Sequence, residues 1–137
     1  MNVVLDADVV IGALEGSDRH HLQSRSLFRR LRQQGTPRLI SAVNLSEVLV
    51  APAADRERLR RAREAIAAFG VAVHQPNEAI AVEAARLRGR YPISLPDGYC
   101  VATAKQIDAS VVSFDAKVIR AARGERIATS GLGRTRP

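Results

Sequence analysis

The sequence predicts an α/β sandwich with a mostly parallel central sheet of about five strands. Short apolar runs recur along the chain, and most are followed by longer segments with the apolar spacing of amphipathic helices. Strands that alternate with helices in this way form parallel sheets covered by helices. The chain has 137 residues, of which 46% are hydrophobic, so it can form one such domain and is too short for two.

Five short apolar runs are the predicted strands. They lie at residues 2–6, 38–40, 71–74, 111–112 and 126–128. The first run ends in Asp6, and Asp115 comes shortly after the fourth run. Ligands of open α/β sheets bind beyond the carboxyl ends of the strands, so both acids are predicted to lie at a ligand-binding edge.

Helices are predicted between these strands. Their ranges are 9–14, 17–34, 42–50, 56–69, 77–87, 96–105 and 117–122. Asp8, Ser17 or Asp18, and Ser41 are the predicted caps of the first three helices. Gly35 is predicted to end the second helix. The buried stripe of that helix is predicted to consist of Leu22, Leu27, Phe28 and Leu31.

The alternating pattern fills residues 1–129, which we predict to form one domain without internal repeats. Residues 130–137 are rich in Gly, Arg and Pro and are predicted to be a disordered tail. No apolar run approaches the ~20 residues that span a bilayer, and the N-terminus lacks a signal-peptide pattern. Cys100 is the single cysteine, which is typical of a reducing compartment. We therefore expect a cytoplasmic protein with no membrane contact.

The chain is strongly basic, with 21 Lys and Arg against 14 Asp and Glu and a net charge of +7. A basic surface favours a polyanionic partner, nucleic acid first. An arginine-rich composition is also typical of GC-rich genomes, so charge alone leaves both interpretations open. Only 4% of the residues are aromatic, which leaves few stacking platforms for bases. His20, His21 and His74 lack metal-ligand spacing and are interpreted as ordinary residues.

Four acidic residues stand out in this basic chain. Asp97 lies in the first turn of a predicted helix, where the helix dipole favours negative charge. A helix N-terminus and a strand C-terminus share one edge of a parallel sheet, so Asp97 is predicted to meet Asp6 and Asp115. Glu47 lies in an otherwise apolar helix, which is unfavourable unless the carboxylate is paired or metal-bound. The alternative is that Glu47 reaches solvent beside Asn44.

Several carboxylates in one small cleft repel one another and require a cation. Oxygen ligands select hard cations such as Mg²⁺ or Mn²⁺. A Mg²⁺ ion held by carboxylates and waters typically acts on phosphates, because it activates water and neutralises charge on the phosphoryl oxygens. An acidic metal pocket within a basic surface therefore favours a nuclease.

Four motifs, taken in order, resemble the pattern of the PIN domain family. They are Val-Val-Leu-Asp6-Ala-Asp8, Ser41-Ala-Val-Asn-Leu-Ser-Glu47, Leu-Pro-Asp97 followed by Val-Ala-Thr-Ala, and Val-Val-Ser113-Phe-Asp115. No single motif is very specific, but the ordered set covers the whole chain apart from the tail. The chain looks most like the VapC-type ribonuclease toxins of type II toxin–antitoxin pairs.

The resemblance implies a PIN-like three-layer α/β/α sandwich and a hydrolase, an endoribonuclease that uses Mg²⁺ or Mn²⁺. It implies that a metal-activated water cuts RNA phosphodiester bonds, with Asp6, Glu47, Asp97 and Asp115 as metal ligands and catalytic acids. Ser113 resembles the family's small hydroxyl residue and is assigned an orienting role toward a water or a carboxylate; a hydrogen bond to the backbone is the alternative. A homodimer is implied, together with a cognate antitoxin whose C-terminal segment covers the active-site groove.

Two positions depart from the family pattern. Asp8 stands where the family usually has Ser, Thr or Asn, and it either adds a carboxylate to the metal site or caps the helix, which is the favoured interpretation. Many members carry a further acid shortly after the last aspartate. Here Ala116, Lys117 and Val118 follow Asp115, so the second metal position is expected to be weak.

Alternative functions remain open. One is a non-catalytic RNA- or partner-binding PIN-like module, although the presence of all four acids argues against it. Another is a haloacid-dehalogenase-type phosphatase with Asp6 and Asp8 as nucleophile and acid. That enzyme would need a later lysine and an acidic pair at strand ends, and this chain has no such pair. A receiver-like domain is less favoured, because the strand that ends in His74 carries no acid.

Overall fold

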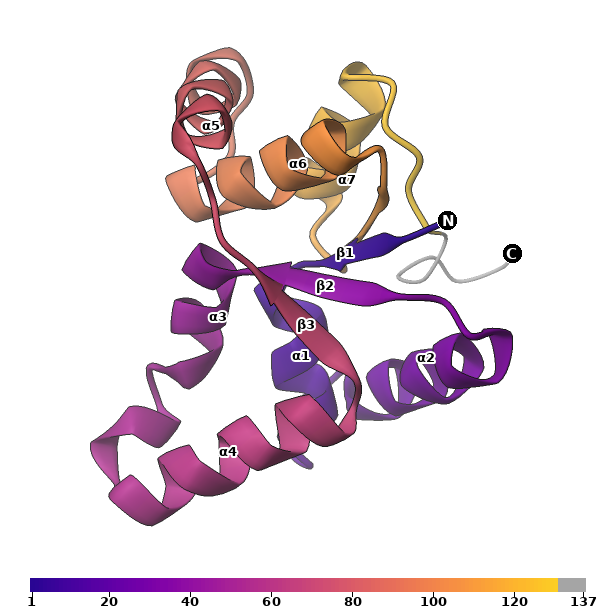
Figure 1. The fold of residues 1–137 in the computed structure, drawn as a ribbon, viewed down its shortest axis with the longest axis vertical. Helices are drawn as coiled ribbons and strands as arrows, with labels where there is room; N and C mark the ends of the chain where they lie inside the picture. Colours follow the sequence, from indigo (N-terminus) through magenta and orange to yellow (C-terminus); the bar gives the residue numbers. More distant parts are fainter. Residues whose placement is uncertain (131–137) are drawn as a thin grey trace.

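The computed structural model describes residues 1–130, which contain one sheet of four parallel strands (Figure 1). The strands are β1 (Val3–Leu5), β2 (Arg38–Ser41), β3 (Val71–His74) and β4 (Ser110–Val112). Their order across the sheet is β3-β2-β1-β4, and every pair of neighbours is parallel. The predicted parallel sheet is confirmed.

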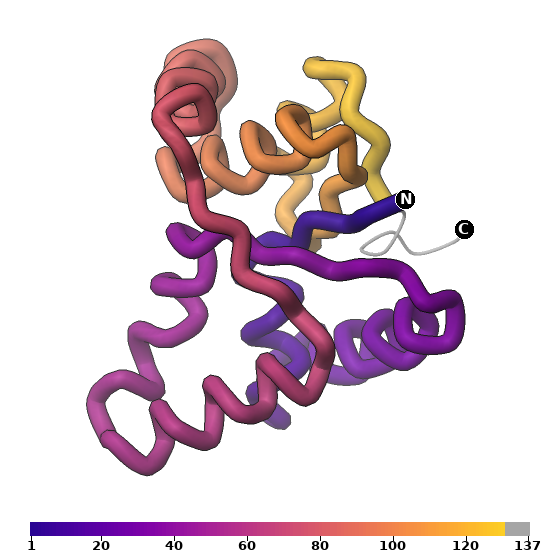
Figure 2. Tube along the Cα trace, viewed as in Figure 1, coloured from indigo at the N-terminus to yellow at the C-terminus, as the bar shows by residue number. Residues whose placement is uncertain are grey.

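The central position of β1 determines where the sheet can bind a ligand. In this strand Val4 pairs with Leu39 on one side and with Val111 on the other. The first strand of the chain and its last strand are therefore neighbours, and their proximity can be followed in Figure 2. The chain leaves β1 toward β2 and β3 and reaches β4 on the opposite side, so a topological switch point lies between β1 and β4.

Helices cover both faces of the sheet, which gives the predicted three-layer sandwich (Figure 1). One face carries α1 (Ala7–Leu14), α2 (His21–Gln34) and α4 (Arg56–Ala68), and the other carries α5 (Glu78–Arg90), α6 (Leu95–Ile107) and α7 (Ala116–Gly124). The helix α3 (Ala42–Leu49) begins directly after β2, and the short 3-10 helix η1 (Pro52–Ala54) follows it. None of the helices found between residues 1 and 130 combines the length and the apolarity that crossing a membrane requires.

Each face of the sheet has its own apolar core. Leu5 of β1 and Phe28 of α2 belong to one core, whereas Val4 of β1 and Val101 of α6 belong to the other. Neighbouring side chains of β1 thus point to opposite faces, as strand geometry requires. Because both faces are buried, the strand is a continuous apolar run rather than an alternating one.

The fifth predicted strand, 126–128, does not form. Within the described residues Thr129 makes only a single parallel bridge, with Val111, so the sheet has four strands. The turn after α7 places Arg126 at a φ of 62°, a backbone angle that no extended strand contains. Of the predicted tail 130–137, only Ser130 lies within the described residues, and its N–H donates to the Val111 carbonyl at 3.1 Å.

Several predicted helix ends are confirmed, and two details of α2 are wrong. The Ser41 hydroxyl accepts a main-chain N–H and caps α3, and Gly35 ends α2 at a φ of 65°. However, α2 begins at His21 rather than at residue 17, because residues 17–20 form turns. Leu22 was predicted to be buried but is 81% exposed, because it points away from the core that this helix helps to form.

Candidate active site

Asp6 is the most buried acid of the candidate site, with an exposed fraction of 4%. It follows the last residue of β1, and its Oδ1 accepts the N–H of Ala7 at 2.8 Å, which caps α1. Its Oδ2 accepts the hydroxyl of Ser113 at 2.7 Å. The carboxylate is therefore held at the switch point between β1 and β4, where the sequence predicted it.

The surroundings of Asp6 disfavour its negative charge. Burial is the largest influence and raises the pKa of this carboxyl to about 8, and the negative charges of Asp8 and Asp97 act in the same direction. The hydrogen bonds from Ser113 and from the Ala7 N–H oppose the shift without cancelling it. A bound cation would remove this penalty, because opposite charge favours the ionised carboxylate.

Asp8 does not cap α1, so the favoured interpretation of this residue is wrong. Helix α1 begins at Ala7, one residue before Asp8, and the cap is Asp6. The Oδ2 of Asp8 instead accepts the N–H of Phe114 at 3.0 Å, while its Oδ1 is buried without a hydrogen-bond partner. Burial raises the pKa of Asp8 to about 6, the Phe114 N–H opposes the rise, and the charge of Asp115 adds to it.

Ser113 connects the acid after β1 with the acid after β4. It is 1% exposed, and besides donating to Asp6 its hydroxyl accepts the main-chain N–H of Asp115 at 3.0 Å. The contact with Asp6 is the one that the predicted orienting role requires, and the contact with the Asp115 N–H is the backbone hydrogen bond of the alternative interpretation. Asp115 itself is exposed, and its Oδ1 accepts the N–H of Lys117 at 2.9 Å, which caps α7.

Asp97 and Glu47 come from α6 and α3. Asp97 forms a capping box with Ser94, in which each side chain accepts the other residue's main-chain N–H at 3.2 Å. Glu47 is half-buried, and its Oε1 accepts from the Asn44 amide at 3.1 Å. The same amide donates to the Pro96 carbonyl at 3.0 Å and thereby ties α3 to the first turn of α6.

Asn44 is a residue of this site that the sequence analysis did not predict. One interpretation of Glu47 put both residues on a solvent-facing side, but Asn44 is fully buried, and its Oδ1 has no hydrogen-bond partner among residues 1–130. A polar residue one turn before Glu47 in an apolar helix was the available signal. Its partner Pro96, however, lies 52 residues away in the chain and could not be identified from local spacing.

A buried thiol behind the site lies within electrostatic reach of several of the acids. Burial raises the pKa of Cys100, and four carboxylates, from Asp6, Asp8, Asp97 and Glu47, raise it further. Cys100 is fully buried one turn along α6 from Asp97. Asp115 influences the pKa of Asp8 in the same direction. A common metal site for Asp6, Glu47, Asp97 and Asp115 stays a prediction.

The donors of this site fit a hard divalent cation, although no ready-made coordination shell is present. Among residues 1–130, no three His, Cys, Asp or Glu side chains are placed closely enough to enclose a metal. Mg²⁺ needs only one or two protein carboxylates, because it keeps several of its waters. The unpartnered Oδ1 atoms of Asp8 and Asn44, both buried, are further oxygen donors next to these carboxylates.

A hollow of about 360 Å³ lies beside Glu47. Side chains of α1, α3, η1 and α4 line it. Most of this lining is apolar, as at Ile11, Leu14 and Val48, but Arg58 and Arg61 of α4 also contribute. Glu15 and Glu47 also line the hollow, so its charged side chains are two arginines and two glutamates.

Several solved structures share this fold. FitAcB from Neisseria gonorrhoeae has a TM-score of 0.69 at 20% identity, over 97% of this chain and 99% of that chain. VapBC2 from Rickettsia felis, bound to a DNA fragment from its promoter, has a TM-score of 0.71 at 14% identity, over 95% and 98%. VapC20 from Mycobacterium tuberculosis, described as a sarcin–ricin loop cleaving toxin, has a TM-score of 0.70 at 16% identity, over 88% and 95%.

Sequence comparison identifies the family. No curated protein sequence matches the chain. The sequence profile of the PIN domain, in contrast, matches residues 3–124. Because this match extends from the first residue of β1 to the last residue of α7, the chain belongs to the PIN domain family, as its four motifs predicted.

Proposed function

We propose that this PIN domain is a Mg²⁺- or Mn²⁺-dependent endoribonuclease and the toxin of a toxin–antitoxin pair. The observation that carries the proposal is the environment of Asp6, which is 4% exposed and next to other carboxyls at the switch point of the sheet. A carboxyl cluster of this kind weakens the fold unless a cation neutralises it. Divalent cations that prefer oxygen ligands act mainly on phosphate groups.

The residues that would hold the cation are Asp6, Asp97, Asp115 and Glu47, with Asp8 beside them. When bound, the metal supplies Lewis-acid stabilisation of the charge that develops on the phosphoryl oxygens and makes an attacking water more acidic. Ser113 keeps the Asp6 carboxylate in one orientation through its 2.7 Å hydrogen bond. Asn44 does the same for Glu47 and fixes α3 against the start of α6.

Similar structures support an RNA substrate and a protein inhibitor. One of them is described as a toxin that cleaves the sarcin–ricin loop, and others are toxin–antitoxin complexes. The net charge of +7 on this chain favours a polyanionic substrate. The apolar hollow beside Glu47, with its two arginines, provides a surface for an antitoxin segment. A homodimer stays a prediction from the family resemblance.

The first test is a calorimetric titration of the full chain with Mn²⁺ and with Mg²⁺. We expect saturable binding to the parent and none to Asp6→Asn, because the substitution removes the charge and leaves the shape. A matched control is Asp108→Asn, which makes the same chemical change at the exposed far end of α6. This control should bind Mn²⁺ as the parent does.

The second test is cleavage of RNA by the same proteins. We expect the parent and Asp108→Asn to cut total RNA in Mn²⁺ and to leave 5′-phosphate and 3′-hydroxyl ends. EDTA and Asp6→Asn should each abolish cleavage while the fold, followed by circular dichroism, is retained. Metal binding without cleavage of any RNA would favour the non-catalytic module, and no metal binding by the parent would overturn the proposed metal site.

A further inference from the structure

An imidazole ring lies flat on a phenyl ring at the edge of the candidate site. His20 from the turn before α2 stacks on Phe114 from the turn between β4 and α7, with ring centroids 3.9 Å apart and planes inclined by 13°. Both residues are only half-buried. The ring of His20 therefore has one face against Phe114 and remains partly accessible to solvent.

The stack adjoins the acidic cluster directly. The main-chain N–H of Phe114 is the partner of Asp8 Oδ2, and the residue before it is Ser113. His20 is also within electrostatic reach of Asp8. Burial is the largest influence on the pKa of Asp8 and raises it, whereas the charge of His20 lowers it.

The orientation of the imidazole is fixed before any ligand binds. Nδ1 of His20 lies 2.9 Å from Oε1 of Gln23, and the main-chain N–H of His20 donates to Oδ1 of Asp18 at 2.8 Å. A ring held in this way loses little conformational entropy when a flat ligand stacks on it.

Other aromatic rings of the chain have different settings. Phe28 and Phe69 pack against each other with centroids 4.8 Å apart, and Tyr91 donates its hydroxyl to Glu125. Within the described residues, the His20–Phe114 pair is the aromatic stack next to the acids. This position changes the interpretation of His20, which the sequence analysis treated as an ordinary residue.

We propose that His20, supported by Phe114, is a base-stacking residue of the active site and receives a nucleobase of single-stranded RNA next to the scissile phosphate. This inference rests on the proposed function, because it assumes an RNA substrate. Bases that are splayed out of single-stranded RNA commonly stack on aromatic or histidine side chains. Every base has a π-face, so such a contact positions RNA with little sequence preference.

The steady-state test compares three substitutions of His20 in the full chain with Mn²⁺ and a short single-stranded RNA that the parent cleaves. His20→Ala should raise KM roughly 5- to 100-fold, the range that loss of one base stack produces, with a much smaller change in kcat. His20→Phe should restore KM because it keeps a flat ring, and His20→Gln should not. The control His21→Ala alters the adjacent histidine, whose Nδ1 contacts the Gly12 carbonyl, and should leave KM unchanged.

A binding test does not depend on cleavage. The chain contains no tryptophan, so His20→Trp introduces a single indole at the stack. We expect a single-stranded RNA dodecamer of mixed sequence to quench its fluorescence, and an abasic ribose-phosphate dodecamer of the same length to leave it unchanged. In the complementary experiment, 2-aminopurine in the RNA should be quenched by the parent and by His20→Phe but not by His20→Ala.

The outcomes separate this inference from the proposed function. Base-dependent quenching that requires an aromatic ring at position 20, without cleavage, would support the stacking residue and overturn the nuclease. Cleavage with the same KM in the parent, His20→Ala and His20→Gln would overturn the stacking residue and leave the nuclease intact. Equal quenching by intact and abasic RNA would also overturn it, because the contact would then be with the backbone.

Discussion

Asp6 is the residue at which pH and stability are most closely linked. The pKa of its carboxyl is raised from 3.8 to about 8, mainly by burial and then by the charge of Asp8. The folded protein therefore holds this proton more tightly than the unfolded chain does. The contribution of Asp6 to stability is complete below pH 4 and is lost progressively as the pH rises toward 8, while no metal is bound.

The first residue-scale prediction follows from this linkage. In EDTA, Asp6→Asn should gain stability relative to the parent as the pH is raised from 5 to 8, by about 1 kcal/mol or more, since one pKa unit corresponds to about 1.4 kcal/mol. Thermal unfolding of both proteins at the two pH values measures the gain. If the stabilities of the two proteins changed in parallel with pH, the Asp6 carboxyl would ionise without a loss of stability. That result would contradict the effect of burial on its pKa. Added Mn²⁺ should stabilise the parent but not Asp6→Asn, so that the parent becomes the more stable of the two proteins.

The positions of the acids in the fold could be predicted from the sequence, whereas the residues that form hydrogen bonds with them could not. Asp6 and Asp115 could be placed because the carboxyl ends of parallel strands share one edge, and Asp97 because a helix begins there. The hydrogen bond from Ser113 to Asp6 spans 107 residues of sequence and depends on the pairing of β1 with β4. Asn44 contacts Glu47 within its own helix, but its other partner, the Pro96 carbonyl, lies 52 residues away in the chain.

At the scale of elements, α6 packs closely against α5 at Gly98. A Cβ atom added to Gly98 would lie 2.8 Å from the carbonyl oxygen of Ala84, a separation that requires backbone movement. Gly98 directly follows Asp97, so the same contact determines where the acid at the start of α6 is held. The absence of a side chain here lets the two helices approach closely.

Gly98→Ala should therefore destabilise the protein by about 1–3 kcal/mol, the usual effect of inserting an atom into a packed contact. It should also weaken Mn²⁺ binding, because α6 carries Asp97. Gly89→Ala is the matched control: a Cβ there meets no atom within 4 Å, and the position lies inside α5. That variant should be more stable than the parent by up to about 1 kcal/mol, because alanine favours helix. Chemical denaturation measures the free energy of unfolding of Gly98→Ala and Gly89→Ala. Equal changes in the two variants would show that the contact between Gly98 and Ala84 does not limit the packing of α6.

The limits of element prediction have local causes. Ser41 and Gly35 were predicted as helix ends because capping depends on residues close in sequence. The first helix starts at Ala7 because Asp6, not Asp8, supplies the cap, and two aspartates so close in sequence give the same signal. Leu22 was predicted to be buried because it is apolar, but it lies five residues before Leu27, which at about 3.6 residues per turn places it on another face of α2. The buried position one turn before Leu27 is taken by Ser24.

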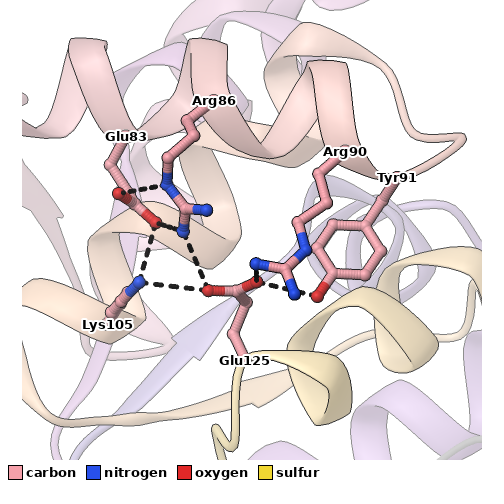
Figure 3. A network of polar contacts seen from close by, with 6 residues as sticks. All are labelled: Glu83, Arg86, Arg90, Tyr91, Lys105 and Glu125. Carbon is pink, nitrogen blue, oxygen red and sulfur yellow. Dashed lines mark hydrogen bonds and ion pairs between the residues drawn. The ribbon is translucent and has the colours of Figure 1, made fainter.

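At the scale of the whole molecule, one polar network joins the end of α7 to α5 and α6, which lie on the same face of the sheet (Figure 3). Glu125, at the end of α7, has a side chain that is only 5% exposed. It accepts from the Tyr91 hydroxyl at 2.7 Å, from Arg86 at 2.9 Å and from Lys105 at 3.0 Å. Burial raises the pKa of Glu125, but these hydrogen bonds outweigh it and bring the pKa to about 2.

Glu125→Gln should lower stability at pH 7 by about 1–3 kcal/mol, because it leaves charged donors without their shared acceptor. The corresponding fall in Tm is several degrees. Since the pKa of Glu125 is lowered, the stabilisation is present above pH 4.5 and disappears as the pH falls toward 2, so parent and variant should converge in acid.

The control for this prediction is Glu64→Gln. The side chain of Glu64 is 62% exposed and, among residues 1–130, pairs with Arg60 on the same helix, so its loss should change stability by less than about 0.5 kcal/mol. Thermal unfolding of the three proteins at pH 7 and at pH 3 measures both effects. If Glu125→Gln and Glu64→Gln lowered Tm by the same amount, Glu125 would contribute no more to stability than an exposed surface charge does.

The pairing of the first strand with the last one has a consequence for the synthesis of the protein. Ser113, the hydrogen-bond partner of Asp6, is translated 107 residues after it, and β4 is translated shortly before Ser113. Contacts of such high sequence separation form late in folding, because closing the long loop between them costs conformational entropy before the contacts stabilise the protein. A growing chain therefore carries an incomplete site, and a message truncated before residue 110 encodes a product without the proposed nuclease. The candidate site is therefore complete only after Asp115 has been translated.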